Sequence, residues 1–445
     1  MGDFRRIADR IADDIATGRL RPGQQLPPQR WFARRHRIAP STAGRVYGEL
    51  VRRGLVVGEV GRGTFVRAAP PVGQARALVE TATAAPVNLE LNYPYAPGQS
   101  ELLAPALAPL LRPDMLTEAV RPAPADGTAA ARAAAAGLLA LPGWRPDPGR
   151  FLFTGNARQA IAAALASLAR PGCRVGVEEL TYPLVKEIAA RLGIVLVPIT
   201  GDGEGLRPDA LAAAHRAAPL SALYLQPALH NPTSLATSER RVGELARQAQ
   251  DLDLPVVEDR IWSFLRPDPD ATPLAAHAPG LTLVVDGLSK RVAPGLTVGF
   301  LVVPPQRVEA VADAVRSGGW SAGRFALEAA VRWAGDGTVA RLVAAKRADA
   351  ARRQRLLAAR LDGFTVRTDP HGYFAWWELP APWRADTFTA AAAAHGVAVT
   401  PGTAFTVDPH RTPDAVRLGL ASAGEEELAR SLEVLAGIAR GVGPG

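Results

Sequence analysis

The sequence predicts an α/β protein made of two unequal parts, a small basic head and a much larger body. Residues 1–67 contain 14 arginines and six acidic residues, so the whole net charge of +8 lies there and the rest of the 445-residue chain is neutral. In that rest, short apolar runs alternate with amphipathic helical patterns, which predicts a largely parallel sheet covered by helices on both faces. A chain of this length is expected to form two or three domains.

The head is predicted to contain three helices followed by a hairpin. Phe4, Ile7, Ile11 and Ile15 repeat on one helical face that ends at Gly18. The other elements follow in order: a second helix after Leu26-Pro27-Pro28, a third helix that starts at Ser41 or Thr42 and ends at Gly54, and a hairpin of 55–57 and 64–66. Two helices joined by a tight turn and followed by a basic-tipped hairpin are typical of a winged helix-turn-helix.

A winged helix-turn-helix of this charge is expected to bind double-stranded DNA. Its third helix would present polar side chains to base edges or phosphates, and the tip of the wing would add a basic contact. The residues that we expect to face DNA are Arg30, Arg34, Ser41, Thr42, Arg45 and Arg62. The alternative is a solvated basic helical domain.

Residues 68–87 are rich in Ala, Pro, Thr and Gly and are predicted to be a linker. The body then spans 88–445, with a large domain at about 120–305 and a small α+β lobe at about 340–445. Its predicted elements are, in order, helices 101–111 and 128–140, strand 151–154, helix 157–169, strand 174–177, helix 184–192, strands 194–197 and 221–226, helix 238–250, strands 255–258 and 282–285, a helical region 305–360, and the lobe pieces 364–378, 386–400 and 415–420.

Polar clusters follow four of the predicted strands. They are the segments 153–159, 179–183, 227–233 and 258–259. The carboxyl ends of parallel strands gather at one edge of a sheet, where ligands of such folds bind. The first cluster also opens a helix, so its amides and the helix dipole can hold a phosphate. Each cluster alone could be a helix cap or a turn, but four in sheet order favour a binding site.

Lys290 lies between two apolar runs, in the segment LTLVVDGLSKRVAPGLTVGF of residues 281–300. The chain has only three lysines, at 186, 290 and 346, among 51 basic residues, so arginine fills most surface positions. A lysine near buried strands is costly unless it has a task, and arginine cannot replace it in Schiff-base chemistry. The alternative is a solvated loop lysine.

The composition of the whole chain restricts the class of protein further. No apolar run is long enough to span a bilayer, and the N-terminus lacks the pattern of a signal peptide. The single cysteine, Cys173, cannot form an internal disulfide, which fits a reducing cytoplasm. No metal site is expected.

The head resembles the DNA-binding domain of GntR-family repressors. The similarity runs through GRLRPGQQLPPQRWFARRHRIAPSTAGRVYGELVRRGLVVGEVGRGTFV, which has the family's G-x-L-x-P-G-x-x-L-P turn, R-x-x-A helix, Y-x-x-L core and G-x-G-T-[FY]-V wing. Pro40-Ser41 replaces the more usual Ser-Arg, which affects the expected base contacts.

The four strand-end clusters and the Ser289-Lys290 pair resemble fold-type-I aminotransferases that use pyridoxal 5′-phosphate. The similarity spans roughly 88–437, and behind a GntR-type head the whole chain resembles a MocR-type regulator. The resemblance implies that Lys290 forms a Schiff base with the cofactor, Asp259 pairs with the pyridine nitrogen, Asn231 bonds the ring O3′, Tyr182 stacks on the ring, and Asn156, Ala157, Arg158 and Ser289 hold the phosphate. Arg417 would clamp a substrate carboxylate.

Three positions depart from the aminotransferase pattern. Thr297 replaces the phosphate-binding arginine, which removes a charge-assisted bond of roughly 1.5–3 kcal/mol that Arg158 or Arg291 could partly restore. Trp262 replaces the tyrosine that touches O3′ and offers only an N–H donor. Asn156 stands at a usual glycine. These changes weaken the expected cofactor site and argue against full transamination.

Three functional hypotheses remain open from the sequence. The first is a cytoplasmic, homodimeric transcription factor whose aminotransferase-like domain senses pyridoxal 5′-phosphate or an amino compound. The second is a working aminotransferase with a DNA-binding appendage. The third is a sensor that no longer binds the cofactor. The basic head and the altered positions 262 and 297 favour the first.

Overall fold

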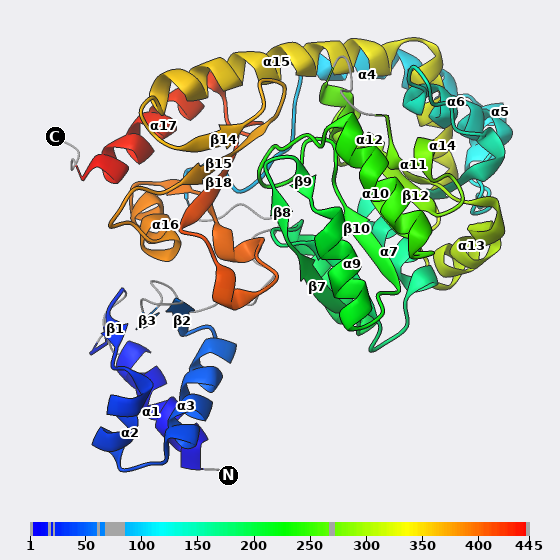
Figure 1. The fold of residues 1–445 in the computed structure, drawn as a ribbon. Helices are drawn as coiled ribbons and strands as arrows, with labels where there is room; N and C mark the ends of the chain where they lie inside the picture. Colours follow the sequence, from blue (N-terminus) through cyan, green and yellow to red (C-terminus); the bar gives the residue numbers. More distant parts are fainter. Residues whose placement is uncertain are drawn as a thin grey trace.

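The chain forms a small N-terminal head and a larger body, and the long helix α15 (Thr338–Arg360) runs along both parts of the body (Figure 1). The structure is a computed structural model that describes residues 3–16, 19–20, 23–59, 63–66, 85–266 and 272–441. Residues 68–84 of the predicted linker lie outside these ranges. Within them, no helix is both long and apolar enough to cross a membrane.

The head packs three helices against a three-stranded antiparallel sheet of order β1-β3-β2. Its elements are α1 (Asp3–Ala16), β1 (Gln25–Leu26), α2 (Gln29–His36), α3 (Pro40–Arg52), β2 (Val56–Glu59) and β3 (Gly63–Val66). Phe32, Tyr47 and Val66 meet in its core, as a winged helix-turn-helix requires. The third helix begins at Pro40 with Ala39 as its N-cap, not at a side-chain cap from Ser41 or Thr42, because the fixed φ of proline suits the first helical position.

The large domain is built on a seven-stranded sheet of order β5-β13-β12-β11-β10-β6-β7. The strands are β5 (Phe151–Thr154), β6 (Arg174–Glu178), β7 (Val195–Ile199), β10 (Ala222–Leu225), β11 (Val256–Asp259), β12 (Thr282–Gly287) and β13 (Gly299–Val302). β13 runs antiparallel to β12 and to β5, and the other pairs are parallel. The connection 288–298 is too short for the crossover that a parallel neighbour needs, so the chain turns back along β12.

Helices cover both faces of this sheet. Tyr224 and Val257 point to the face that packs on α7 (Ala157–Leu168) and α13 (Val308–Ser317), whereas Val256 points to the opposite face. The opposite face is covered by α9 (Pro208–Ala217), α10 (Glu239–Asp251) and α11 (Leu274–His277). The remaining helices of this domain are α4 (Gln99–Leu107), α5 (Pro113–Ala119), α6 (Ala129–Leu139), α8 (Pro183–Leu192), α12 (Leu288–Arg291) and α14 (Arg324–Gly335).

The smaller lobe carries a four-stranded antiparallel sheet of order β14-β15-β18-β17. Its elements are β14 (Val366–Thr368), β15 (Phe374–Glu378), α16 (Ala385–Ala394), β16 (Val397–Ala398), β17 (Thr400–Pro401), β18 (Ala415–Gly419) and α17 (Glu425–Arg440). β4 (Val87–Asn88) pairs in parallel with β16, so Val87, which the sequence assigned to the linker, forms part of this lobe. The segment that follows β4 therefore enters the body beside β18.

The head contacts the lobe through its wing. The Arg384 guanidinium lies 4.3 Å from the centre of the Phe65 ring in β3. β2 also lies against the 3-10 turn Pro409–Arg411, and α2 and α3 lie on the side of the head away from the body (Figure 1). The helices that are expected to face DNA therefore stay clear of the lobe.

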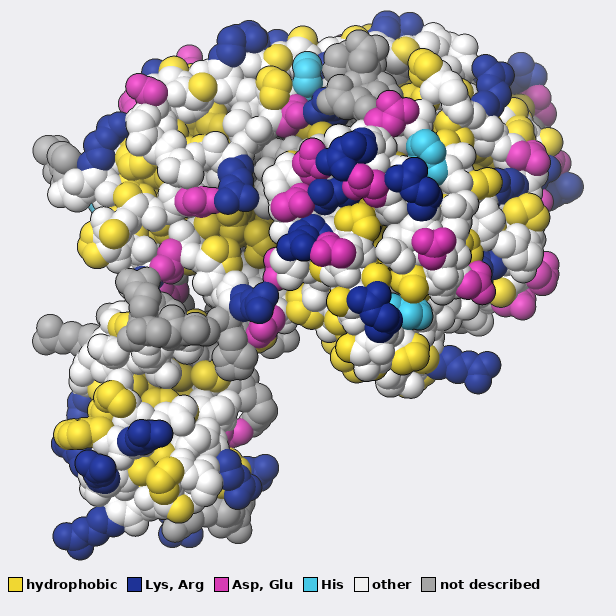
Figure 2. Space-filling model, viewed as in Figure 1, with side chains coloured by type: hydrophobic (Ala, Val, Ile, Leu, Met, Phe, Trp, Pro, Cys, Tyr) yellow, Lys and Arg dark blue, Asp and Glu magenta, His cyan; other side chains and the backbone are white. Residues whose placement is uncertain are grey.

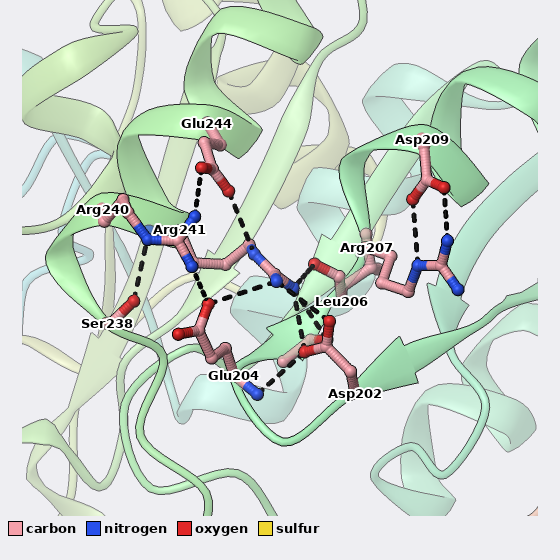
Figure 3. A network of polar contacts seen from close by, with 10 residues as sticks. Asp202, Glu204, Leu206, Arg207, Asp209, Ser238, Arg240, Arg241 and Glu244 are labelled. Atoms are coloured by element: carbon pink, nitrogen blue, oxygen red, sulfur yellow. Dashed lines mark hydrogen bonds and ion pairs between the residues drawn. The ribbon is translucent and has the colours of Figure 1, made fainter.

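A network of arginines and carboxylates fixes the small hairpin of β8 (Gly201–Asp202) and β9 (Gly205–Leu206) (Figure 3). Arg241 of α10 is nearly buried and donates two hydrogen bonds to the Asp202 carboxylate, at 3.0 and 2.9 Å, and one to the Leu206 carbonyl at 3.1 Å. A buried guanidinium needs such complete pairing. The network has a structural role, and none of its side chains lines the cavity described below.

Candidate functional site

A cavity opens at the carboxyl ends of the central strands, between the sheet and the smaller lobe. It holds about 160 Å³, whereas a second cavity among the described residues holds about 20 Å³ and is lined only by apolar side chains. Eleven of the body residues singled out from the sequence line it: Asn156, Ala157, Arg158, Tyr182, Asn231, Asp259, Trp262, Ser289, Lys290, Thr297 and Arg417. The strand-end argument therefore led to one continuous site.

Lys290 lies on the short helix α12, directly after β12. Its Nζ donates a 2.7 Å hydrogen bond to the Asn92 carbonyl and lies 4.5 Å and 5.0 Å from the ring centres of Tyr93 and Trp262. Burial, and then nearby cationic side chains, lower the pKa of Lys290 from 10.5 to about 7. A large share of this amine is therefore neutral near pH 7, the form that can attack a carbonyl.

Asp259 ends β11 at the floor of the cavity. Its carboxylate accepts hydrogen bonds from the Tyr224 hydroxyl (2.8 Å), the Gln226 amide (2.8 Å) and the Ile261 backbone N–H (3.0 Å). These three donors are all neutral, and burial raises the pKa of Asp259 from 3.8 to about 6. The site could therefore stabilise a cationic group placed next to this carboxylate.

The loop between β5 and α7 forms one wall of the cavity. The Asn156 side chain caps α7 by accepting the Gln159 N–H at 3.1 Å, so the helix N-terminus points at the cavity with Ala157 and Arg158. A Cβ on Gly299 of β13 would lie 2.2 Å from the Asn156 carbonyl carbon, so this close approach requires glycine. Thr297 also lines the cavity, and its buried Oγ1 has no hydrogen-bond partner among the described residues.

Arg417 of β18 reaches the cavity from the smaller lobe. Its Nη2 donates to the Glu90 carbonyl and, at 3.0 Å, to Thr400 Oγ1, whereas its buried Nε has no hydrogen-bond partner in the ranges that the structure describes. Burial lowers the pKa of Arg417 to about 10, which leaves it charged at neutral pH. A carboxylate beside Nε would complete its hydrogen bonds.

Three further predicted side chains surround the space between Lys290 and Asp259. Asn231 donates its backbone N–H to Gln226 Oε1 at 3.3 Å, and no described residue donates a hydrogen bond to its buried Oδ1. Burial raises the pKa of Tyr182, so its hydroxyl stays protonated. Trp262 packs edge-on against Phe374, with ring centres 5.5 Å apart, which fixes its indole at the cavity wall.

Arg291 does not line the cavity. Its guanidinium donates a 2.6 Å hydrogen bond to the Asp286 carboxylate, and both side chains are buried beneath α12. The idea that Arg291 replaces the missing phosphate arginine is therefore wrong, because its charge is already paired within the fold. Arg158 does line the cavity.

The residues expected to face DNA lie on the head. Arg30 and Arg34 on α2, and Ser41 and Arg45 on α3, are exposed, and Thr42 is half-buried; Arg62 lies outside the described residues. Basic side chains clearly outnumber acidic ones on the face of the head seen in Figure 2. The Arg45 guanidinium lies 4.2 Å from the centre of the Phe4 ring, so it is held against α1 as well as being exposed.

Sequence reasoning missed several residues of the site. Asn92 and Tyr93 reach Lys290 from the segment after β4, and Tyr224 and Gln226 hold Asp259. The signal for the last two was available, since a tyrosine and a glutamine interrupt an apolar strand two residues apart. No local signal marked Asn92, because its position depends on the pairing of β4 with β16.

The fold and site define an aminotransferase-like body behind a winged-helix head. The family model "Aminotransferase class I and II" matches residues 117–435, and the chain belongs to this family. The model "Bacterial regulatory proteins, gntR family" matches residues 4–66. This combination confirms the predicted class, a MocR-type transcriptional regulator, in preference to an aminotransferase with an appendage.

Individual relatives agree with this class. The chain is 29% identical over 433 residues to the HTH-type transcriptional regulator YdeF of Bacillus subtilis, covering 97% of this chain and 93% of YdeF. It is 25% identical over 316 residues to the HTH-type pyridoxine biosynthesis transcriptional regulator PdxR of Corynebacterium glutamicum, covering 69% and 67%. Among solved structures, the α-aminoadipate aminotransferase LysN of Thermus thermophilus superimposes with a TM-score of 0.74 at 22% identity, covering 84% of this chain and 95% of LysN. The last match concerns the fold alone.

Proposed function

We propose that this regulator binds pyridoxal 5′-phosphate in the cavity through Lys290 and controls DNA binding by the head accordingly. The observation that carries the proposal is the pairing, in one cavity, of an amine whose pKa is lowered to about 7 with a buried carboxylate bonded by neutral donors. Burying these two groups without a ligand lowers the stability of the fold. The amine can react with a carbonyl, and the carboxylate can stabilise a cationic ring nitrogen.

The polar groups of the cavity fit this cofactor. Asn231 Oδ1, Thr297 Oγ1 and Arg417 Nε are buried, lack hydrogen-bond partners within the described part of the chain, and belong to residues that line the same space. Buried polar atoms without partners are costly, so three in one cavity support a polar ligand. At Gly299, β13 lies so close to the Asn156 backbone that any Cβ would disrupt this wall of the cavity.

Each end of the cofactor has candidate partners among the lining residues. The phosphate would bind at the N-terminus of α7, with Asn156, Ala157 and Arg158, and receive hydroxyl donors from Ser289 and Thr297. The ring would stack on Tyr182, with its nitrogen at Asp259 and its phenolic oxygen near Asn231 and Trp262. When bound, the cofactor supplies a carbonyl for amines and a protonated ring that withdraws electrons.

The proposed effector is the cofactor itself or an amino acid that joins it. Arg417 would bind the effector's carboxylate through Nε, and the neutral Lys290 amine would exchange with the effector's amino group. The name of PdxR, a regulator of pyridoxine biosynthesis, supports an effector of the vitamin B6 class. The name of PtsJ of Salmonella typhimurium, a vitamin B6 salvage pathway transcriptional repressor, 26% identical over 301 residues, gives similar support.

Double-stranded DNA is the proposed partner of the head. Four of the six candidate contacts are arginines, and the whole net positive charge of the chain lies in residues 1–67. The proposed division is a DNA-binding domain at 1–67, a linker at 68–87 and a ligand-binding body at 88–445. A reducing cytoplasm is the proposed location.

A homodimer is also part of the proposal. Tyr95, Leu111, Val120 and Phe325 are large apolar side chains exposed on the body, between 37% and 79% of their surface. Tyr95 follows the segment that carries Asn92, and Phe325 begins α14, which packs on α4 and α5. Cover by a second copy would remove this apolar surface from water.

The experiment is a spectroscopic titration of the full chain with pyridoxal 5′-phosphate. Wild type is expected to develop visible absorbance that borohydride removes, and Lys290→Ala is expected to lack it. With only three lysines in the chain, peptide mapping after reduction assigns the label without ambiguity. A wild type with no band at saturating cofactor, or a label on Lys186 or Lys346, would refute the proposal.

A further inference from the structure

The other two lysines of the chain are both bound to backbone carbonyls. Lys186 of α8 donates to the carbonyls of Ala404 (2.9 Å) and Thr406 (2.8 Å). Lys346 of α15 is fully buried and donates to three carbonyls of the segment that carries Lys290. Neither of these lysines lines the cavity, and each amine donates to several backbone carbonyls, a geometry that suits a compact ammonium.

Lys346 binds the carbonyl end of α12. Its Nζ donates to the carbonyl oxygens of Lys290 (3.0 Å), Arg291 (3.1 Å) and Val292 (2.6 Å). The last carbonyls of a helix have no partner within the helix, and a cation there also interacts favourably with the helix dipole. Burial lowers the pKa of Lys346 from 10.5 to about 7, and in its protonated form the amine satisfies three of these carbonyls with all three of its N–H groups.

A planar guanidinium could not replace this ammonium in the same space. Its donors diverge in a fixed fork, whereas three carbonyls of one turn converge on a single point. The side chain of Lys346 also has no exposed surface into which a larger group could extend. These requirements explain why lysine stands at this position.

The contacts of Lys346 also connect α12 to the smaller lobe. The Tyr373 hydroxyl lies 2.7 Å from the Lys346 carbonyl and 2.9 Å from the Asp349 carboxylate, which pairs with Arg353 at 2.8 Å. Arg353 in turn donates to the Leu420 and Ala423 carbonyls after β18. The Lys290 carbonyl is thus bound by Lys346 of α15, and α15 is bound to the lobe through Asp349 and Arg353.

The amine of Lys290 is held from the same part of the lobe. Asn92, whose carbonyl accepts Lys290 Nζ, accepts the Ala421 N–H through its side chain at 3.1 Å. Both ends of Lys290 are therefore attached, by separate routes, to residues 420–423. Hydrogen bonds therefore connect the lobe with both the carbonyl and the amine of Lys290.

We propose that Lys346 is a positioning residue that sets the orientation of α12 and thereby directs the Lys290 amine into the cavity. This proposal rests on the function proposed above only where its test measures the reaction with the cofactor. Lys346 does not line the cavity, so it acts through Lys290 and not on a ligand.

The test compares Lys346→Met, which keeps the length of the stem and removes the donors, with Lys346→Arg, which keeps the charge and changes the geometry. Lys186→Met is the matched control, because it removes a carbonyl-binding lysine that does not touch α12. The first readout is the rate at which borohydride-reducible absorbance appears with pyridoxal 5′-phosphate. Both Lys346 variants are expected to slow it at least tenfold, and the control to stay within about threefold of wild type.

The second readout needs no cofactor. Acetic anhydride labels free amines, and peptide mass measurements give the labelling rate of Lys290 separately from the other lysines. We expect this rate to change at least fivefold in Lys346→Met and to be unaltered in Lys186→Met. Hydrogen exchange at the amides of 288–292 should accelerate in the same variant.

The outcomes separate the two proposals. If wild type forms no linkage with the cofactor but Lys346→Met changes the labelling of Lys290, the cofactor proposal fails and the positioning role stands. If both Lys346 variants keep wild-type linkage and labelling rates, the positioning role is wrong. If Lys346→Met does not fold, Lys346→Arg decides, and wild-type rates in a folded Lys346→Arg would overturn the proposal.

Discussion

Replacing Asp259 by asparagine should make the cofactor-free protein less sensitive to pH while weakening cofactor binding. Burial raises the pKa of Asp259 from 3.8 to about 6. A carboxyl with a raised pKa binds its proton more tightly in the folded state, so its contribution to the free energy of unfolding is fully present below pH 3.8 and is lost as the pH rises to about 6. The difference corresponds to roughly 3 kcal/mol at neutral pH.

The hydrogen bonds of Asp259 set how much of this cost asparagine can remove. The amide oxygen of asparagine can still accept from Tyr224 and Gln226. Its NH₂ group would then face the Ile261 N–H, which now donates to the carboxylate, and this mismatch costs about 1–3 kcal/mol. At pH 7.5 we therefore expect the free energy of unfolding of Asp259→Asn to exceed that of wild type by about 0–2 kcal/mol.

The assay is urea unfolding of the cofactor-free protein between pH 4 and pH 8. The difference between wild type and Asp259→Asn should grow in favour of the variant as the pH rises to 6 and then level off. Asp202→Asn is a control of opposite sign, because a hydrogen bond from Arg241 lowers the pKa of Asp202 and its carboxylate stabilises the fold at neutral pH. Equal pH dependence in wild type and Asp259→Asn would refute the reasoning.

Three more substitutions address the ligand and the DNA. Thr297→Arg should tighten cofactor binding by about 1.5–3 kcal/mol, measured by titration, and no change would mean that Arg158 already supplies the charge. Arg417→Ala should weaken an amino acid effector at least tenfold but leave an amine without a carboxylate unaffected, and equal losses for both ligands would remove Arg417 from carboxylate binding. Arg45→Ala should cost about 1–3 kcal/mol of DNA affinity if the side chain reads a base, and wild-type affinity would assign Arg45 to its contact with Phe4 alone.

The sequence predicted the cavity well because most of the cavity residues follow strands of a parallel sheet, and the carboxyl ends of such strands lie at one edge of the sheet. Asp259 ends β11 and Lys290 follows the end of β12 by three residues, and neighbouring parallel strands bring such positions together. The spacing of residues along the chain therefore sufficed to collect side chains from five segments. The same reasoning placed the head, where charge and helical periodicity are local properties.

Contacts that depend on non-local pairing escaped prediction. Val87 was assigned to a linker, although it pairs with Val397 more than 300 residues away. Arg291 was considered for the phosphate, although its buried partner Asp286 follows from the register of β12 and not from composition. Lys346 lies in a helix of ordinary pattern, and its three carbonyl partners become visible only when α15 is placed over α12.

The central claim is that ligand binding in the cavity and DNA binding by the head are coupled. A ligand shifts an equilibrium only by its difference in affinity for two states, and the coupling must be the same in both directions. The measurement is the dissociation constant of pyridoxal 5′-phosphate for the full chain, with and without a duplex that the chain selects from a random DNA library. We predict that the duplex changes this constant at least fivefold, that the cofactor changes the DNA dissociation constant by the same factor, and that Lys290→Ala removes both effects. Equal affinity for the cofactor with and without DNA would contradict the account.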